Sequence, residues 1–354
     1  MPLPIRYLCV DALRGLTVAA MLLVNNAGDW NHVHPLLSHA AWHGLQPADL
    51  IFPLFLFIVG VSAVMSLQPR LDGGTPANVL WREVILRGLR ITALGIALHI
   101  LAATVIDGRD FRLFGVLQRI GLCFVMAGLC IIALRPRALS LLATGLLISY
   151  GHLLTLGDST PTENLAARVD SWLLGPLAYQ FDPATGRAFD PEGLISTIGA
   201  FITTLLGARA GHALRQGDRR FLWLGGLGCL AAGWIAAQIQ PINKALWTPT
   251  FVLVTGGFSS LLLALFHDLM DHRGWPAIGR AMGRNALAAY AGSWSLACLL
   301  TIGSTDRRLY QLLFGAIVNR YGDEAASAAW AIAVTALWWF LMRLCHARRW
   351  YWRM

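Results

Sequence analysis

Two histidines and an acid stand close together at the start of a long apolar segment. His39 and His43 lie four positions apart with Trp42 between them, and Asp49 directly precedes the apolar run. An imidazole near a carboxylate is a common general base for removing a proton from an amine or a hydroxyl near neutral pH. Polar groups are costly to keep where a membrane span begins, so they indicate a site. We interpret residues 38–53 as a candidate catalytic stretch with His39 as its base.

A metal site is the alternative for this part of the chain. His32, His34, His39 and His43 lie within twelve residues, and such spacings occur among zinc ligands. Loop histidines often only titrate, however, and the chain has no CxxC motif to supply thiolates. We expect no metal.

The composition is that of a membrane protein. Of the 354 residues, 56% are apolar and 13% are charged, whereas a soluble domain carries about 25% charged residues. Apolar runs near the ~20 residues needed to cross a bilayer recur along the chain. The net charge of +9 comes from residues scattered between these runs, which is typical of orientation signals rather than of a nucleic-acid surface. We expect the lipid bilayer as a partner and no nucleic acid.

The apolar runs predict an all-α, polytopic integral membrane protein that forms a single transmembrane domain over residues 1–354. Boundaries at Arg, Pro and Gly divide these runs into about ten helices. The predicted spans are 10–26, 48–67, 84–105, 114–134, 138–156, 193–209, 221–239, 249–267, 285–302 and 325–345.

Charge asymmetry predicts the orientation. Most of the 28 Lys and Arg residues fall at the span ends that share a side with both termini. Positive residues favour the cytoplasmic side, so we expect both termini inside, in a multi-pass protein of a bacterial inner membrane. Residues 38–53 then face outward, where most of the acids also lie. An acidic vestibule attracts a cationic ligand such as an amine; alternatively, the acids simply avoid cytoplasmic loops.

Several strings resemble one known family. VDALRGLTVAAMLLVNN, followed by SHAAWHGLQPADLIFPLFLFIVG, is similar to the start of the catalytic domain of the heparan-α-glucosaminide N-acetyltransferase family, lysosomal transmembrane enzymes whose superfamily includes bacterial NagX-type members. The resemblance runs from about Val10 to Tyr290. Its further strings are GVLQRIGL, RVDSWLLG, FDPEGLISTIGA, PINKALWTPTFVLVTGG and GRNALAAY.

The resemblance implies an acetyltransferase that takes acetyl-CoA from the cytoplasm and acetylates an amino sugar, such as glucosamine, on the far side. The catalytic histidine of the family's HAxW string corresponds to His39, and the asparagine ending the first span corresponds to Asn25. Asp49 occupies the ADL position, where it orients His39 or binds the acceptor amine. His43 and Gln46 depart from the Asn and Thr expected there, which leaves the acceptor open.

Acetyl-CoA carries phosphates that suit arginine forks near the inner face. Gln118 and Arg119 differ from the other candidates because the apolar run 114–134 buries them, and a buried Arg is functional by default. Asn285 either caps the following helix or contacts the cofactor. The arginines that we expect to supply two or three phosphate contacts are Arg14, Arg87, Arg90, Arg280 and Arg284; each alone could be an orientation charge.

Aromatic faces and carboxylates suit a sugar ring that bears an ammonium. Each of two segments has an alternative to acceptor binding. Residues 190–193 are also typical of a turn whose acids lie in the first turn of the next helix, and residues 241–244 are typical of an ordinary turn between helices. The candidate acceptor-binding residues on the outer side are Trp42, His43, Asp170, Glu192, Asn243, Lys244 and Trp247.

In this reading His39 removes a proton from the amine as it attacks the thioester, and Asn25 donates a hydrogen bond to the oxyanion. Transfer through an acetyl-histidine is the second route. A proton-coupled amino-sugar transporter using His39, Asp49 and Arg119 is one rival, and an O-acetyltransferase of a cell-envelope glycan is another. A homo-oligomer is left open.

Overall fold

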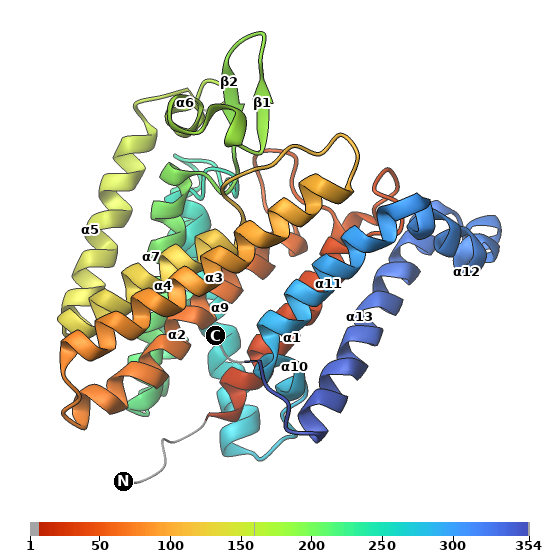
Figure 1. Cartoon of the computed structure of the whole chain (residues 1–354). Helices are drawn as coiled ribbons and strands as arrows, with labels where there is room; N and C mark the ends of the chain where they lie inside the picture. The colour runs from red at the N-terminus through yellow and green to blue at the C-terminus, as the bar shows by residue number, and fades with distance from the viewer. Residues whose placement is uncertain (1–6, 159, 353–354) are drawn as a thin grey trace.

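Long α-helices packed side by side form most of the computed structural model (Figure 1), which describes residues 7–158 and 160–352. Two predicted orientation charges, Arg6 and Arg353, lie outside the described residues. The helices are α1 (Leu8–Asn25), α2 (Ile51–Asp72), α3 (Ala77–Val105), α4 (Val116–Ala133), α5 (Pro136–Leu154), α6 (Leu165–Leu173), α7 (Leu194–Arg215), α8 (Arg219–Ala236), α9 (Pro249–Phe266), α10 (Arg280–Arg284), α11 (Ala286–Thr301), α12 (Thr305–Tyr321) and α13 (Asp323–Ala347).

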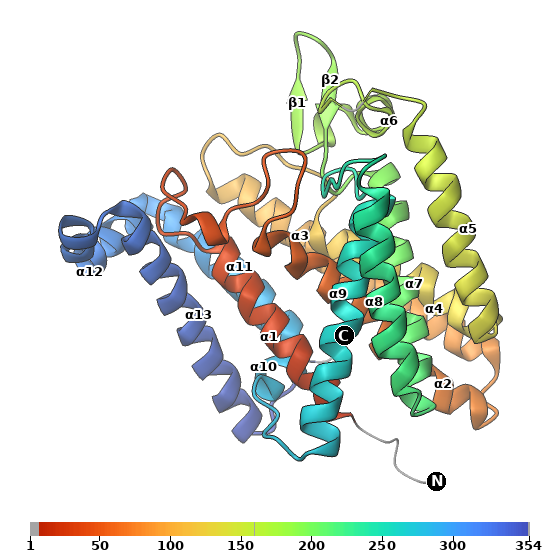
Figure 2. The same ribbon diagram turned by 180° about the vertical axis from the view of Figure 1, so that it is seen from behind.

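Within the described residues, nine helical segments are long and apolar enough to cross a membrane. They confirm the prediction of an all-α, polytopic membrane protein. Each of the ten predicted spans coincides with a long helix, but α8 is not among the nine. It begins with Arg219 and Arg220 and is rich in glycine, which lowers its hydropathy. It nevertheless packs along α9 (Figure 2).

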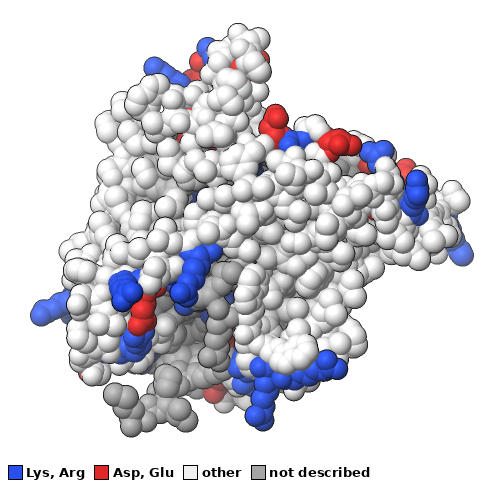
Figure 3. Space-filling view, in the orientation of Figure 1, with Lys and Arg blue, Asp and Glu red and all other residues white. Residues whose placement is uncertain are grey.

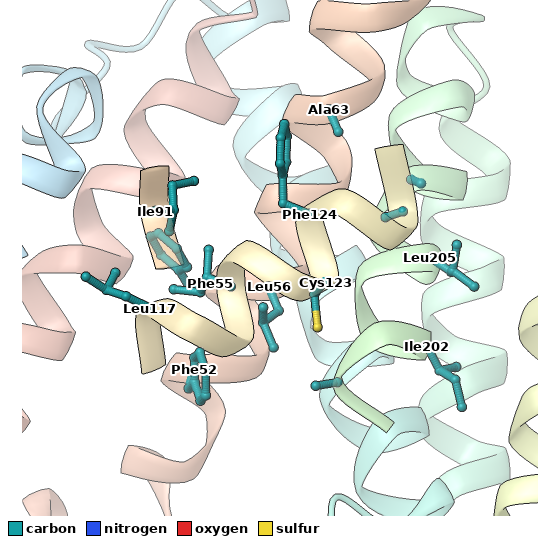
Figure 4. Packing of buried hydrophobic residues seen from close by; sticks show 14 of the residues in the cluster. Phe52, Phe55, Leu56, Ala63, Ile91, Leu117, Cys123, Phe124, Ile202 and Leu205 are labelled. Atoms are coloured by element: carbon teal, nitrogen blue, oxygen red, sulfur yellow. The ribbon is translucent and has the colours of Figure 1, made fainter. Parts of the chain in front are cut away.

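Close helix contacts depend on glycines. A Cβ atom at Gly60 in α2 would lie 2.0 Å from the carbonyl oxygen of Thr204, and one at Gly207 in α7 would lie 2.0 Å from that of Phe57. Small residues let helix backbones approach closely where lipid supplies little hydrophobic drive for helix association. The core that α2, α4 and α7 enclose is filled by aromatic and aliphatic side chains, among them Phe55, Leu56, Cys123, Phe124, Ile202 and Leu205 (Figure 4).

A small cap covers one end of the bundle. It contains α6 and the antiparallel strands β1 (Gln180–Asp182) and β2 (Arg187–Phe189) (Figure 1). The sequence predicted residues 157–192 only as a long polar connection, and this hairpin is the exception to the all-α prediction. Two buried acids hold the cap: Asp170 accepts the N–H of Leu194 at 3.0 Å, and Asp190 accepts those of Tyr179 at 3.1 Å and Glu192 at 2.9 Å.

The two ends of the bundle differ. We call the end with residues 38–50 and the cap the site end, and the end with the α2–α3 connection and α10 the opposite end. Helix α1 begins and α13 finishes at the opposite end (Figures 1 and 2). In Figure 3, Lys and Arg gather toward that end, whereas acidic and basic side chains mix along the upper rim.

Candidate active site

A short 3₁₀ helix positions the acid of the predicted pair. Residues Pro47–Leu50 form this turn, in which Asp49 Oδ2 accepts the backbone N–H groups of Gln46 at 3.0 Å and Ala40 at 3.1 Å. The other oxygen, Oδ1, lies 2.8 Å from Nδ1 of His39. The side chain of Asp49 is fully buried, whereas that of His39 is 45% exposed. A proton on Nδ1 donated to the carboxylate leaves Nε2 as the basic nitrogen.

Lys244, from the α8–α9 connection, completes a cluster with this pair. Its Nζ lies 3.2 Å from Asp49 Oδ1 and 2.9 Å from His39 Nδ1. Burial lowers the pKa of Lys244 below its ordinary value, against the opposing attraction of Asp49. One buried carboxylate therefore faces an ammonium and an imidazole together.

The turn that carries Lys244 is fixed to the histidine stretch. Gly44 donates its N–H to the carbonyl of Ile242 at 2.8 Å, and Asn243 Nδ2 lies 3.4 Å from His43 Nδ1. Trp247 has a φ of 50°, a left-handed conformation that is unfavourable for a bulky residue. Backbone strain of this kind persists only where the surroundings hold it.

Arg119 supplies part of that support. It is fully buried, as the apolar run predicted, and it donates to the carbonyl of Gly193 at 3.2 Å and to Ser196. Its guanidinium lies 5.1 Å from the ring centroid of Trp247, whose Nε1 donates to Thr203 at 3.0 Å. Arg119 thus connects α4 and the start of α7 to the turn that presents Lys244.

The cluster opens on a cavity of about 1500 Å³. Glu192 on its wall pairs with Arg112 at 3.2 Å, and the Arg112 guanidinium lies 4.8 Å from the Tyr179 ring. Six of the predicted site residues line the cavity: Asn25, His39, Trp42, Glu192, Lys244 and Trp247.

Other predicted residues lie behind or beside the cavity. Asp49 and Asn243 are buried under it, while His43 is exposed beside Asn243. Asp170, predicted to bind the acceptor, lies outside the cavity lining and instead accepts the N–H of Leu194 at the start of α7. Gln118 donates to the carbonyl of Leu113 at 3.0 Å and likewise lies outside the lining.

The predicted phosphate-binding arginines lie away from the cavity, on α1, α3 and α10. Arg14 donates to the carbonyl of Gly283 and to Ser62, and Arg87 stacks on Phe124. Arg90 is exposed on α3, and Arg284 stacks on Tyr351. The Nε of Arg280 is buried without a hydrogen-bond partner among residues 7–158 and 160–352, which makes it a donor suited to an anion.

Among the described residues, Asn285 makes no side-chain capping hydrogen bond to α11, and its contact with the cofactor stays a prediction. Its Nδ2 donates to the carbonyl of Trp350 at 3.1 Å, and its Oδ1 accepts the N–H of Trp352 at 3.2 Å. The side chain therefore fixes the C-terminal segment against α11.

The four histidines considered as metal ligands have separate neighbours. His32 pairs with Asp29 at 2.8 Å, and His34 accepts the N–H of Leu36, while His39 and His43 contact Asp49 and Asn243. In the described part of the chain, the ligand atoms close enough to share a metal belong instead to Cys9, His267 and Asp271.

Sequence reasoning missed several cavity residues. Tyr290 and Trp294 stack with ring centroids 6.5 Å apart on α11, and their i, i+4 spacing predicts a shared helix face. Asn26 bonds to Ser293 at 3.2 Å. Arg112 also lines the cavity, and nothing in its local sequence indicates a pair with Glu192.

Comparisons with known proteins point to one family. A family model described as heparan-alpha-glucosaminide N-acetyltransferase, catalytic, matches residues 6–224. The human heparan-alpha-glucosaminide N-acetyltransferase is 27% identical over 357 aligned residues, covering 82% of this chain and 53% of that protein. The mouse protein of the same name is 26% identical over 354 residues, covering 81% and 53%. The chain spans about half the length of these curated relatives.

Proposed function

The chain belongs to the heparan-alpha-glucosaminide N-acetyltransferase catalytic family, and we propose that it transfers acetyl from acetyl-CoA to the amine of an amino sugar. The observation that carries this proposal is the buried Asp49 bonded to the half-exposed His39 at the cavity wall. Residues 1–354 would act as one transmembrane acyltransferase domain in a bacterial inner membrane, with both termini in the cytoplasm.

His39 would act as the general base. Asp49 holds the imidazole through Nδ1, so Nε2 can take the proton that the amine loses as it attacks the thioester carbonyl. Asn25, exposed on the same cavity wall, would donate a hydrogen bond to the oxyanion that develops on that carbonyl. An acetyl-histidine formed at Nε2 is the two-step variant of this chemistry.

Glu192 and Trp42 are suited to acceptor recognition. Glu192 offers a carboxylate to an ammonium, and Trp42 offers an aromatic face beside Phe189. His43 and Asn243 stand behind this wall and would tune which acceptor fits.

Acetyl-CoA would approach from the opposite end. The exposed Arg90 and the buried Nε of Arg280 can receive its phosphates. Arg87 is three residues before Arg90 on α3, and Arg284 is four residues after Arg280 on α10. Arg14 is on α1, which packs against α10. Arg14 lies eleven residues before Asn25 on α1, so the pantetheine arm would cover about 16 Å of helix.

The test is acetyl transfer by the purified protein in lipid nanodiscs. With acetyl-CoA and glucosamine, we expect free thiol and N-acetylglucosamine to appear in equal amounts. Saturable glucosamine uptake into proteoliposomes without transfer would instead establish the transporter. Acetylation of a glycan hydroxyl, with glucosamine inert, would establish the O-acetyltransferase.

A further inference from the structure

The cavity extends well beyond the His39 cluster. Its volume of about 1500 Å³ exceeds the roughly 300–1000 Å³ of most small-molecule pockets. A single amino sugar at His39 therefore leaves much of the space for another part of the ligand. Polar side chains line the cavity at the starts of α12 and α13, among them Asp306, Arg307 and Asp323. The portion that we call the apolar arm is lined by Leu296 and Leu300 of α11, Val318 of α12, and Trp330 and Val334 of α13.

The apolar arm extends along α13 toward half the depth of the bundle. Val334 stands eleven residues into α13, a helix of 25 residues that is apolar enough to cross a membrane. At 1.5 Å per residue, the arm penetrates about 16 Å from the start of that helix. A cavity at this depth, walled by Leu, Val and Trp, suits a hydrocarbon chain.

Helix α12 has the character of an interfacial helix beside the arm. Each of its residues is at least partly exposed. Leu312 and Leu313 are 79% and 61% exposed, and the same helix carries Arg307 and Arg308. Exposed leucines on a helix that also carries arginines are typical of a helix that lies in the membrane interface. Tyr310 of α12 packs against Trp330 of α13, with their ring centroids 5.9 Å apart. Because α12 borders the arm in this way and exposes Leu312 and Leu313, we expect the arm to lie next to lipid.

We propose that the acceptor is amphiphilic: an amino sugar that bears a hydrocarbon chain, with the sugar at His39 and the chain in the apolar arm. His39 and the residues of the apolar arm line the same cavity, so one molecule can reach both. This inference rests on the proposed acetyltransferase activity and names the class of its acceptor as a glycolipid.

The experiment compares two acceptors in nanodiscs, octyl β-glucosaminide below its micellar concentration and free glucosamine. Each methylene buried in an apolar site contributes roughly fourfold in affinity. Even a partly buried octyl chain should therefore lower KM at least tenfold. Equal kcat/KM for both acceptors would show that the arm holds only bilayer lipid and would overturn the proposal. Transfer to neither acceptor would contradict the acetyltransferase activity itself.

A matched pair of variants separates the arm from simple partitioning of the alkyl acceptor into the bilayer. Val334→Trp fills the arm, so the preference for the octyl acceptor should fall from tenfold or more to near one. Ile332→Trp adds the same side chain on the exposed side of α13 and should keep the preference. A preference that survives Val334→Trp, in protein folded as well as Ile332→Trp, would contradict the assignment of the chain to the arm.

Discussion

The carboxylate of Asp49 has more partners than a single ion pair requires. It accepts two backbone N–H groups through one oxygen, and the other faces both His39 and Lys244. A fully buried charge is tolerated only when it is hydrogen-bonded and neutralised in this way. The arrangement fixes the imidazole before any ligand binds, which is the preorganisation that general base catalysis needs.

His39→Ala should abolish acetyl transfer, because the remaining groups cannot take the proton from the amine. Positioned bases typically contribute about 10²–10⁴-fold to the rate. Binding of CoA, measured by calorimetry, should be nearly unchanged. His34→Ala is the control, since His34 lies in the neighbouring loop and its partly exposed ring accepts the N–H of Leu36, away from Asp49. Wild-type turnover by His39→Ala would remove His39 from the mechanism.

Label from [¹⁴C]acetyl-CoA that stays on the wild-type protein but not on His39→Ala would favour the two-step route.

Sequence spacing could predict the His39–Asp49 pair because only ten residues separate the two and a tight turn joins them. It could not place Lys244, which is 205 positions from His39 and entered only through the family resemblance. It could not show that Asp170 is buried against the start of α7, since an acid in an outer loop looks the same whether it binds a ligand or accepts the first N–H of a helix.

Asp190 gives the cap a dependence on pH. Burial, with the nearby charge of Glu192 adding to it, raises its pKa to about 7, whereas an unfolded Asp titrates near about 3.9. Between these values the folded state keeps a proton that the unfolded state has released. The free energy of unfolding should therefore fall as the pH rises from about 4 to about 7.

Asp190→Asn should flatten this part of the stability profile, measured as the thermal unfolding midpoint in one detergent from pH 4.5 to 8. Asp182→Asn, an exposed position of the hairpin whose pKa is lowered by Thr185 and nearby backbone N–H groups, should keep the slope. An unchanged slope in Asp190→Asn would assign the effect to another group.

At the scale of elements, the apolar runs predicted the spans because bilayer thickness sets both length and composition. The hairpin escaped prediction because each strand has only three residues. Helix α12 escaped because its charged residues interrupt the apolar pattern. Neither element contains an uninterrupted apolar run near 20 residues, so neither carries the signal that predicted the spans.

Contact between α2 and α7 should depend on Gly207. A Cβ there would lie 2.0 Å from the Phe57 carbonyl oxygen, and backbone cannot move aside as a side chain can. Gly207→Ala should lower the free energy of unfolding by about 1–3 kcal/mol. Gly145→Ala in α5 is the control, because within the described chain nothing lies within 4 Å of an added Cβ. Alanine favours a helix by up to about 1 kcal/mol over glycine, so this variant should be neutral or stabilised in the same thermal assay.

At the scale of the whole molecule, the two ends of the bundle differ in their chemistry, and we expect them to face different compartments. The candidate site and the cap occupy one end, and the arginine-bearing ends of α1, α3 and α10 occupy the other. The end of a membrane protein that carries more Lys and Arg tends to face the cytoplasm. The proposed donor, acetyl-CoA, carries phosphates and cannot cross hydrocarbon unaided. We therefore expect acetyl-CoA to be supplied on the side that the arginine-bearing end faces.

Orientation can be measured with two single cysteines added to a background in which the native cysteines are replaced. Thr75→Cys marks the α2–α3 connection at a partly exposed position, and Ala184→Cys marks the hairpin at an exposed position. In intact spheroplasts, a membrane-impermeant maleimide should label Ala184→Cys and should label Thr75→Cys only after lysis. In sealed vesicles, transfer should then require acetyl-CoA on the Thr75 side, with acetylated sugar formed on the Ala184 side. The reverse labelling pattern would contradict cytoplasmic termini, and transfer with both substrates confined to the Ala184 side would contradict a route through the bundle.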